Sequence, residues 1–229
     1  MSQELPKSSS PDSITRQYNH IGDAYIEGKE AFFKNVRDLG KEFLTEHLKN
    51  PQEKSLLDVG CGAGAELVTY RDEMHFKQVL GVDPSLTMVQ AAQKVTGDTA
   101  IAQLGDWEHL PVPDASQDYV LGRFSFHYVE KTDAPYREAA RVLRSGGELI
   151  LILPHPVADI RAVENGKEVI KTSLYGGKVV VTYPPHSMND YLSPTFEELF
   201  ELVEKREYKS LERDTDTSVD SLVIVARKR

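Results

Sequence analysis

The stretch that decides the fold is Leu56-Leu57-Asp58-Val59-Gly60-Cys61-Gly62-Ala63-Gly64-Ala65, a short apolar run that ends in alternating glycines. Glycine suits such a turn because a cofactor lying across the carboxyl edge of a sheet needs the backbone itself within contact distance. The free amides at the start of the following helix then face the ligand. The stretch therefore predicts a cofactor-binding turn, with a purely structural glycine turn as the alternative.

Acidic residues near this turn suggest what the ligand contains. Asp83 closes the next apolar run, where its carboxylate can accept hydrogen bonds from both hydroxyls of a ribose; the alternative is that Asp83 caps the following helix. Asp58 can face an ammonium group. Asp106 can accept from an adenine amine while Trp107 supplies an apolar wall. The implied ligand carries adenine, ribose and an amino acid, without a pyrophosphate.

The surrounding sequence alternates between strand and helix patterns, which predicts a doubly wound parallel sheet. The unalternated aliphatic run Leu149–Leu153 is typical of a strand buried on both faces. Near the end of the chain, Thr195 caps a predicted helix that reaches Lys205. Strands are expected at 55–59, 78–82, 99–104, 119–123, 149–153, 208–212 and 221–226, and helices at 65–71, 86–95, 134–143 and 195–205.

Segments outside this core extend it at both ends. Helical spacing from 14 to 48 predicts two helices, with Gly22 and Gly28 as interruptions. After Pro154, the strand patterns at 168–170 and 178–182 predict an inserted hairpin. The expected organisation is a disordered tail at 1–13 and one domain at 14–229, made of lid helices at 14–50, a cofactor-binding core at 51–153, a substrate-covering insertion at 154–193 and a C-terminal helix and strands at 194–229.

Composition narrows the class of protein. The 229 residues are 40% apolar and 28% charged, as in ordinary globular proteins. The formal net charge of -9 argues against nucleic-acid binding. One cysteine, Cys61, excludes an intrachain disulfide and a multi-cysteine metal site. No apolar run approaches the roughly 20 residues of a membrane span, and no secretory signal is visible, so a cytoplasmic protein without metal is expected.

With these motifs, the region Lys54–Leu153 resembles the class I S-adenosylmethionine-dependent methyltransferases, in the small-molecule, type 11-like branch. The resemblance implies an α/β fold with a Rossmann-like, doubly wound, seven-stranded, mostly parallel sheet. It also implies S-adenosylmethionine as cofactor, with a tyrosine-bearing N-terminal helix closing over it. The cofactor-binding residues expected on this basis are Tyr18, Tyr25, Asp58, Gly60, Cys61, Gly62, Asp83, Pro84, Met88, Gly105, Asp106, Trp107 and Arg123.

The acceptor side is predicted from topology. Cofactor motifs occupy the first three strands, so a nucleophile must approach from the next two and from the insertion. Methyl transfer from a sulfonium needs alignment and exclusion of water, and some acceptors also need a base. His127 and His155 are the main candidates for that base, with His186 and Tyr128 behind them. The expected substrate-binding residues, on the insertion, are Tyr175, Tyr183, His186 and Tyr191.

Several alternatives remain open on the sequence. The same glycine turn also fits an NAD(P)-dependent oxidoreductase, although Asp58 and the Asp106-Trp107 pair disfavour it. A non-catalytic module that binds the cofactor is a third possibility. Among methyltransferases the expected partner is a small-molecule acceptor, with tRNA or a protein as the alternative. The assembly is expected to be a monomer or a homodimer.

Overall fold

The computed structural model describes residues 11–33, 39–99, 101–156, 161–164, 166–174, 177, 179–208 and 220–229. Most of the predicted tail at 1–13 lies outside these residues. Helix α1 (Pro11–Phe33) begins at Pro11, so the end of that predicted tail is helical.

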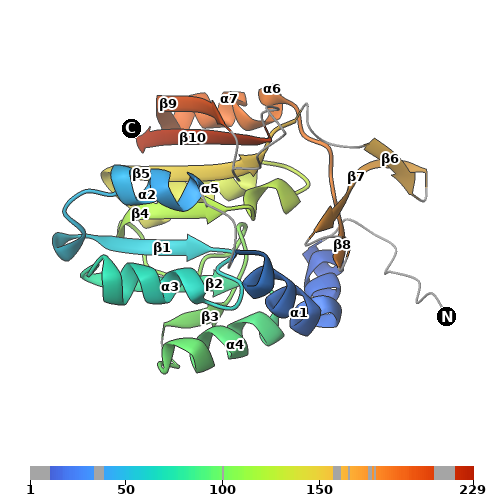
Figure 1. Ribbon diagram of the computed structural model, residues 1–229. Helices are drawn as coiled ribbons and strands as arrows, with labels where there is room; N and C mark the ends of the chain where they lie inside the picture. Colours follow the sequence, from blue (N-terminus) through green and yellow to red (C-terminus); the bar gives the residue numbers. More distant parts are fainter. Residues whose placement is uncertain are drawn as a thin grey trace.

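A seven-stranded sheet organises the chain, in the order β3-β2-β1-β4-β5-β10-β9 (Figure 1). Strand β1 pairs in parallel with β2 and β4, and Asp58 lies opposite both Gly81 and Leu121. Strand β10 runs antiparallel to its two neighbours. This confirms the predicted doubly wound, mostly parallel sheet. The strands are β1 (Ser55–Val59), β2 (Gln78–Asp83), β3 (Ala102–Leu104), β4 (Gln117–Arg123), β5 (Leu143–Pro154), β9 (Phe200–Tyr208) and β10 (Ser221–Lys228).

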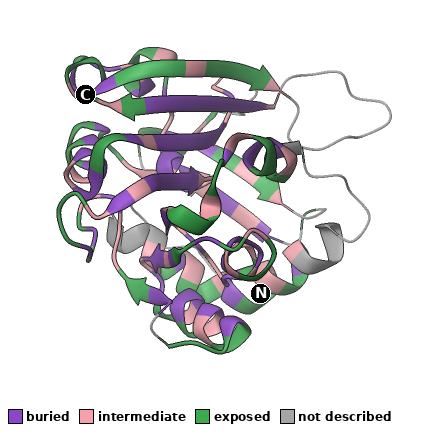
Figure 2. Ribbon diagram, turned by 90° about the vertical axis from the view of Figure 1, so that its left-hand side faces the viewer, coloured by how far each residue is buried: buried purple, intermediate pink, exposed green. Residues whose placement is uncertain are grey.

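Apolar side chains fill both faces of the sheet. Leu56 joins one core cluster, which includes Leu67 and Ala92, whereas its neighbour Leu57 joins the other, which includes Tyr136. Figure 2 shows β10 buried beside the largely exposed outer strand β9. Burial on both faces explains the unalternated aliphatic strands. The helices that flank the sheet are α2 (Leu39–His47), α3 (Ala65–Val68), α4 (Leu86–Thr96), α5 (Asp133–Val142) and α7 (Pro194–Leu199).

Helix α1 runs unbroken through Gly22 and Gly28, so the predicted interruptions are wrong. Gly22 instead allows close packing on α4. A Cβ at that position would lie 2.9 Å from Cγ2 of Thr87 and 3.7 Å from Cε of Met88. The missing side chain therefore lets two helices approach each other, which offsets the helical cost of glycine, about 1 kcal/mol.

The insertion forms its own antiparallel sheet from β6 (Arg161–Glu164), β7 (Lys167–Leu174) and β8 (Val179–Tyr183). The expected hairpin corresponds to β7 and β8, and β6 adds a third strand. Figure 1 shows this sheet and α1 at the carboxyl ends of the parallel strands. Val181 and Tyr183 of β8 belong to one apolar cluster with Ile21 of α1, so the insertion and the N-terminal helix pack together.

The predicted helix from Thr195 to Lys205 is wrong in its second half. Helix α7 ends at Leu199, and β9 starts at Phe200. Pairing with β10 along the whole of β9 satisfies the backbone and outweighs the helical pattern. The cap also differs, because Ser193 rather than Thr195 accepts from the Phe196 amide, at 3.3 Å.

Candidate functional site

An open cavity lies at the carboxyl ends of β1, β2 and β4, beside α1. Its walls come from five parts of the chain: the first helix, the glycine turn, the turn after β2, the turn after β3, and the segment after β4. The residues that line it are Tyr18, Tyr25, Lys29, Asp58, Val59, Gly60, Cys61, Gly62, Glu66, Asp83, Pro84, Met88, Asp106, Trp107, Glu108, Arg123, Phe124, Ser125, Tyr128, Val129 and Glu130.

Of the predicted cofactor residues, all except Gly105 line this cavity. Gly105 serves packing instead, since a Cβ there would lie 2.8 Å from Cδ of Pro111 and 2.9 Å from Cγ1 of Val82. Motifs on separate strands thus meet around one space, as expected where parallel strands end at the same edge.

The three glycines of the turn have different roles. Gly60, Gly62 and Gly64 all have positive φ, at 80°, 55° and 80°. A Cβ on Gly60 would clash with Ser125, and one on Gly64 would lie 2.7 Å from Cβ of Ala92, whereas one on Gly62 would meet nothing within 4 Å. Gly60 and Gly64 therefore permit close packing, while Gly62 leaves its backbone open toward the cavity.

Asp83 is held at the end of β2 by backbone donors. Its carboxylate accepts from the amide of Gly62 at 2.9 Å and from the amide of Ser85 at 2.9 Å. Burial raises the pKa of Asp83 to about 6, although both hydrogen bonds oppose the shift. Ser85, not Asp83, caps α4, so the alternative role for Asp83 as a helix cap is wrong. Each carboxylate oxygen keeps capacity to accept another hydrogen bond from a ligand.

Asp58 lies deeper, and its side chain is 4% exposed. Within the described part of the chain, no residue hydrogen-bonds to its carboxylate. Burial, with help from the negative charge of Glu66, raises the pKa of Asp58 to about 7. A ligand ammonium beside this carboxylate would offset that cost and favour the ionised form.

An ion cluster that the sequence patterns do not predict joins α1, α3 and the end of β4. Nζ of Lys29 lies 2.8 Å from Oε1 and 3.0 Å from Oε2 of Glu66, and Nη1 of Arg123 lies 3.2 Å from Oε1. Burial alone would raise the pKa of Glu66, but the two cations outweigh it and lower the pKa to about 2. The one signal in the sequence is spacing, because Lys29 follows Tyr25 by one helical turn and shares its face.

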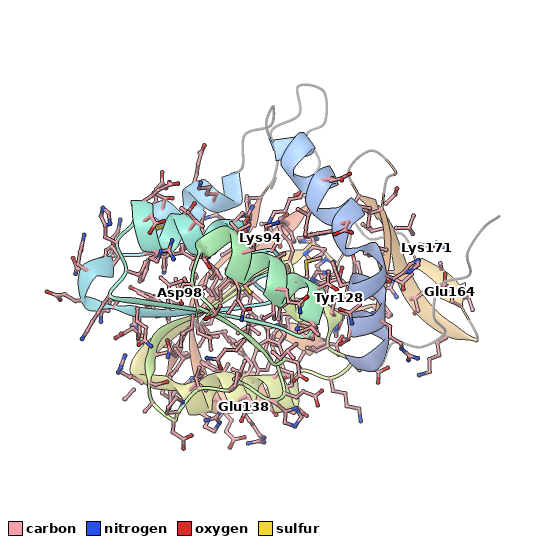
Figure 3. The ribbon with its side chains drawn as sticks, turned by 90° about the horizontal axis from the view of Figure 1, so that it is seen from below. Lys94, Asp98, Tyr128, Glu138, Glu164 and Lys171 are labelled. Carbon is pink, nitrogen blue, oxygen red and sulfur yellow. The ribbon has the colours of Figure 1, made fainter. Side chains whose placement is uncertain are left out.

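Three tyrosines gather on the side of the cavity nearest α1. The hydroxyls of Tyr18 and Tyr128 lie 2.7 Å apart, and their rings are nearly perpendicular, with centroids 5.8 Å apart. Tyr25 packs edge-to-face on Tyr18 at 5.3 Å. Figure 3 shows Tyr128 beside α1, with the small sheet on the far side of that helix. Tyr18 and Tyr25 therefore face the cavity as expected, while Tyr128, expected only as a secondary base candidate, is a third lining ring.

Neither of the two main base candidates lies in the cavity. The side chain of His127 is 3% exposed and packs between Tyr128 and Tyr183, with ring centroids 4.2 Å and 4.4 Å away. Burial, with help from His186, lowers the pKa of His127 to about 3. His155 is buried at the end of β5, 3.6 Å from Glu207. A general base must reach its proton, so this geometry disfavours both histidines.

The predicted substrate residues of the insertion are not brought into the cavity either. Tyr183 is buried against His127, and His186 bonds through Nε2 to the Val129 carbonyl at 2.9 Å. Tyr191 is buried, and its carbonyl accepts from the Tyr136 hydroxyl at 2.7 Å. Tyr175 lies outside the described residues. The described side chains support the wall formed by Tyr128 to Glu130 rather than lining it.

Comparisons with known proteins point to one protein family. Residues 57–151 match a family model described as a methyltransferase domain. Residues 57–151 therefore carry a methyltransferase domain, and the comparisons support a class I S-adenosylmethionine-dependent methyltransferase. It is 30% identical over 143 residues to an uncharacterized methyltransferase of Bacillus subtilis, YcgJ, covering 61% of this chain and 55% of that protein. It is 34% identical over 128 residues to the 27-O-demethylrifamycin SV methyltransferase of Amycolatopsis mediterranei, covering 51% and 46%.

A solved structure shows the same fold as this methyltransferase domain. The S-adenosylmethionine dependent methyltransferase from Mesorhizobium loti superposes with a TM-score of 0.63 at 20% identity, covering 82% of this chain and 96% of that one. The chain spans about half the length of the curated relatives it matches. S-adenosylmethionine is the cofactor of this family.

Two further findings concern the part of the chain that the structure describes. No described helix combines the length and hydropathy needed to cross a membrane. Among the described side chains, no cluster of His, Cys, Asp and Glu is suited to holding a metal ion.

Proposed function

We propose that the chain transfers the methyl group of S-adenosylmethionine to a small-molecule acceptor. The observation that carries the proposal is the contact between Gly62 and Asp83 at the cavity wall. The amide nitrogen of Gly62 lies 2.9 Å from the Asp83 carboxylate, and a Cβ on Gly62 would meet nothing within 4 Å. That pairing suits a ligand with both an amino-acid part and a ribose.

The residues present fit each part of the cofactor. Asp83 would hold the ribose hydroxyls, and Asp106 with Trp107 would flank the adenine. Asp58 would face the methionine ammonium. Lys29 and Arg123, which both contact Glu66 in the same cavity, supply positive charge for the methionine carboxylate. The ammonium and the carboxylate of the cofactor thus each find an opposite charge among the lining residues.

When bound, S-adenosylmethionine supplies an activated methyl group on a sulfonium. The protein then has to orient the acceptor and keep water away. Helix α1 lines the cavity with Tyr18 and Tyr25 and is suited to exclude water. The hydrogen bond between Tyr18 and Tyr128 links this helix to the segment after β4. These contacts support a lid role for α1.

A small molecule is the acceptor best supported by the cavity. Helix α1 and the small sheet crowd the carboxyl ends of the strands, which leaves a pocket rather than an extended groove. The net charge of -9 disfavours the phosphate backbone of tRNA. A cytoplasmic location and a monomeric or homodimeric state remain predictions.

Radiolabelled methyl transfer tests the proposal directly. Purified protein and labelled S-adenosylmethionine would be incubated separately with a cell extract fraction of small metabolites, with total RNA and with total protein. Label in the metabolite fraction alone is expected. Label in RNA or protein would overturn the small-molecule acceptor, and binding of NAD in place of S-adenosylhomocysteine in calorimetry would overturn the methyltransferase proposal.

A further inference from the structure

The charges that line the cavity are unbalanced. Within the described residues, six carboxylates and two cations line it. Both cations, Lys29 and Arg123, contact the same carboxylate, Glu66, on the side of the glycine turn. S-adenosylmethionine carries one net positive charge, so the cofactor offsets only part of the excess. An anionic acceptor would enter a space of negative potential, whereas a cation would be attracted.

Another part of the cavity wall combines aromatic rings with an acid. Tyr18 and Tyr25 come from α1, and Tyr128 comes from the segment after β4, with the rings packed edge-to-face. Glu130 follows Tyr128 by two residues and lines the same cavity at its exposed side. Aromatic rings beside a carboxylate form a site suited to an organic cation, because ring faces carry negative potential.

Beside Tyr18, Tyr128 and Glu130, the described residues that line the cavity add no cationic side chain. Lys29 and Arg123 are the only cationic side chains that line the cavity in the described part of the chain, and Glu66 is 2.8 Å from one and 3.2 Å from the other. A carboxylate or phosphate acceptor would have to compete with Glu66 for them.

We propose that the acceptor carries a basic amine, which binds as an ammonium beside Tyr18, Tyr128 and Glu130. This inference rests on the proposed function, since it names the substrate class of the same cavity. It concerns recognition by charge and aromatic contact. The methylated atom is a separate property of the acceptor.

Three probes of similar size and different charge test the inference. Phenethylamine, 2-phenylethanol and 3-phenylpropionate would be titrated into protein saturated with S-adenosylhomocysteine, with binding followed by NMR line broadening and chemical-shift changes. Phenethylamine is expected to bind best and 3-phenylpropionate worst. Equal binding of the three, preference for the carboxylate, or no binding of phenethylamine overturns the inference.

Variants connect the preference to the named side chains. Glu130→Gln is expected to weaken the binding of phenethylamine about two- to fivefold, in line with an exposed charge pair beside aromatic rings. Tyr128→Leu is expected to weaken the binding of phenethylamine as well. Glu201→Gln, on the exposed edge strand β9, is the matched control and should leave that binding unchanged. An unchanged affinity in Glu130→Gln contradicts the assignment of the site.

Affinity for S-adenosylhomocysteine separates this inference from the proposed function. The Glu130→Gln protein is expected to keep its cofactor affinity while it loses its preference for the amine. Failure of the unmodified protein to bind S-adenosylhomocysteine would count against the methyltransferase proposal itself. Normal cofactor binding without a preference for the amine would overturn the acceptor class alone.

Discussion

The amide of Gly62 donates a hydrogen bond of 2.9 Å to the carboxylate of Asp83, so the turn after β1 and the acid that ends β2 form one structural element. The two residues are far apart in sequence, yet each is positioned by the end of a parallel strand. A second hydrogen bond, from the Ser85 amide, fixes the other carboxylate oxygen. The carboxylate is therefore pre-organised toward the cavity.

Replacing Asp83 with alanine is expected to weaken the binding of both S-adenosylmethionine and S-adenosylhomocysteine. Loss of an acceptor for two ribose hydroxyls costs about 2 to 3 kcal/mol, roughly 30- to 150-fold in affinity. Calorimetry measures the change, and circular dichroism checks the fold. Asp118→Ala, at the opposite end of the sheet, is the control for loss of a carboxylate. Equal affinities of the Asp83→Ala and unmodified proteins would rule out the ribose role.

Valine at position 62 is expected to abolish cofactor binding and to preserve the fold. Its side chain would project into the cavity, where a Cβ meets nothing within 4 Å, although the positive φ adds local strain. Gly64→Val is the matched comparison, because its Cβ would meet Ala92 at 2.7 Å and should disrupt the packing of α3 on α4. Thermal melts and calorimetry distinguish the two. If Gly62→Val also unfolds the protein, the turn is mainly structural.

The raised pKa of Asp58 predicts that both the stability of the protein and its cofactor affinity depend on pH. Because its folded pKa of about 7 exceeds the unfolded value, the contribution of Asp58 to stability is present at low pH and is lost as the pH rises through 7. Asp58→Asn should therefore raise the melting temperature at pH 8 more than at pH 5. A constant difference between the two proteins across this range would show that Asp58 ionises normally.

Cofactor affinity should show the opposite trend with pH. An ammonium group prefers the ionised carboxylate, so affinity for S-adenosylmethionine is expected to rise from pH 6 to pH 8 in the unmodified protein. The Asp58→Asn protein should bind more weakly, with a flatter profile. Asp83 also titrates, with a pKa of about 6, so the difference between the two proteins isolates Asp58. Parallel profiles would argue against contact between Asp58 and the ammonium.

Helix α1 is expected to behave as a lid. Hydrogen exchange of its amides should slow when S-adenosylhomocysteine is added, because lids belong to the less stable parts of a structure and are ordered by ligand. Lys29→Met removes the ion pair with Glu66 and should speed exchange in α1 without ligand. Lys94→Met on α4 is the control. Identical protection with and without ligand would make α1 a fixed wall.

His127 is expected to be structural. Removal of a general base slows a reaction by about 100- to 10,000-fold, whereas His127→Phe should reduce turnover by less than about tenfold, because the ring is buried away from the cavity. Turnover would be measured with the acceptor found in the metabolite fraction. The pH profile should also be unchanged between pH 6 and 9. A collapse of turnover in a folded variant would restore His127 as the base.

The features that the sequence predicts correctly depend on local backbone geometry. A glycine turn after a buried strand and acids at strand ends leave signals within a few residues, so the sequence alone points to Gly60, Gly62, Asp58 and Asp83. The sheet edge then brings them together, because parallel strands share a direction.

The features that the sequence does not predict depend on contacts between distant segments. Lys29 and Glu66 meet only because α1, which packs against α4, brings Lys29 beside the start of α3. The sequence of neither segment identifies this partner. The tyrosines of the insertion have the chemistry of a pocket wall, yet the packing of β8 on α1 buries Tyr183. The strand β9 has a helical pattern, and the partner that makes it a strand, β10, follows later in the chain.

The packing of α1 also has a consequence for synthesis. Helix α1 precedes its neighbours along the chain, since Thr87 and Met88 of α4 and Val181 of β8, which pack against it or in its cluster, are translated later. Because chains fold in part as they are made, α1 lacks its final neighbours until β8 has been made. A nascent chain stalled before β8 therefore contains the glycine turn and Asp83 without the complete packing of α1.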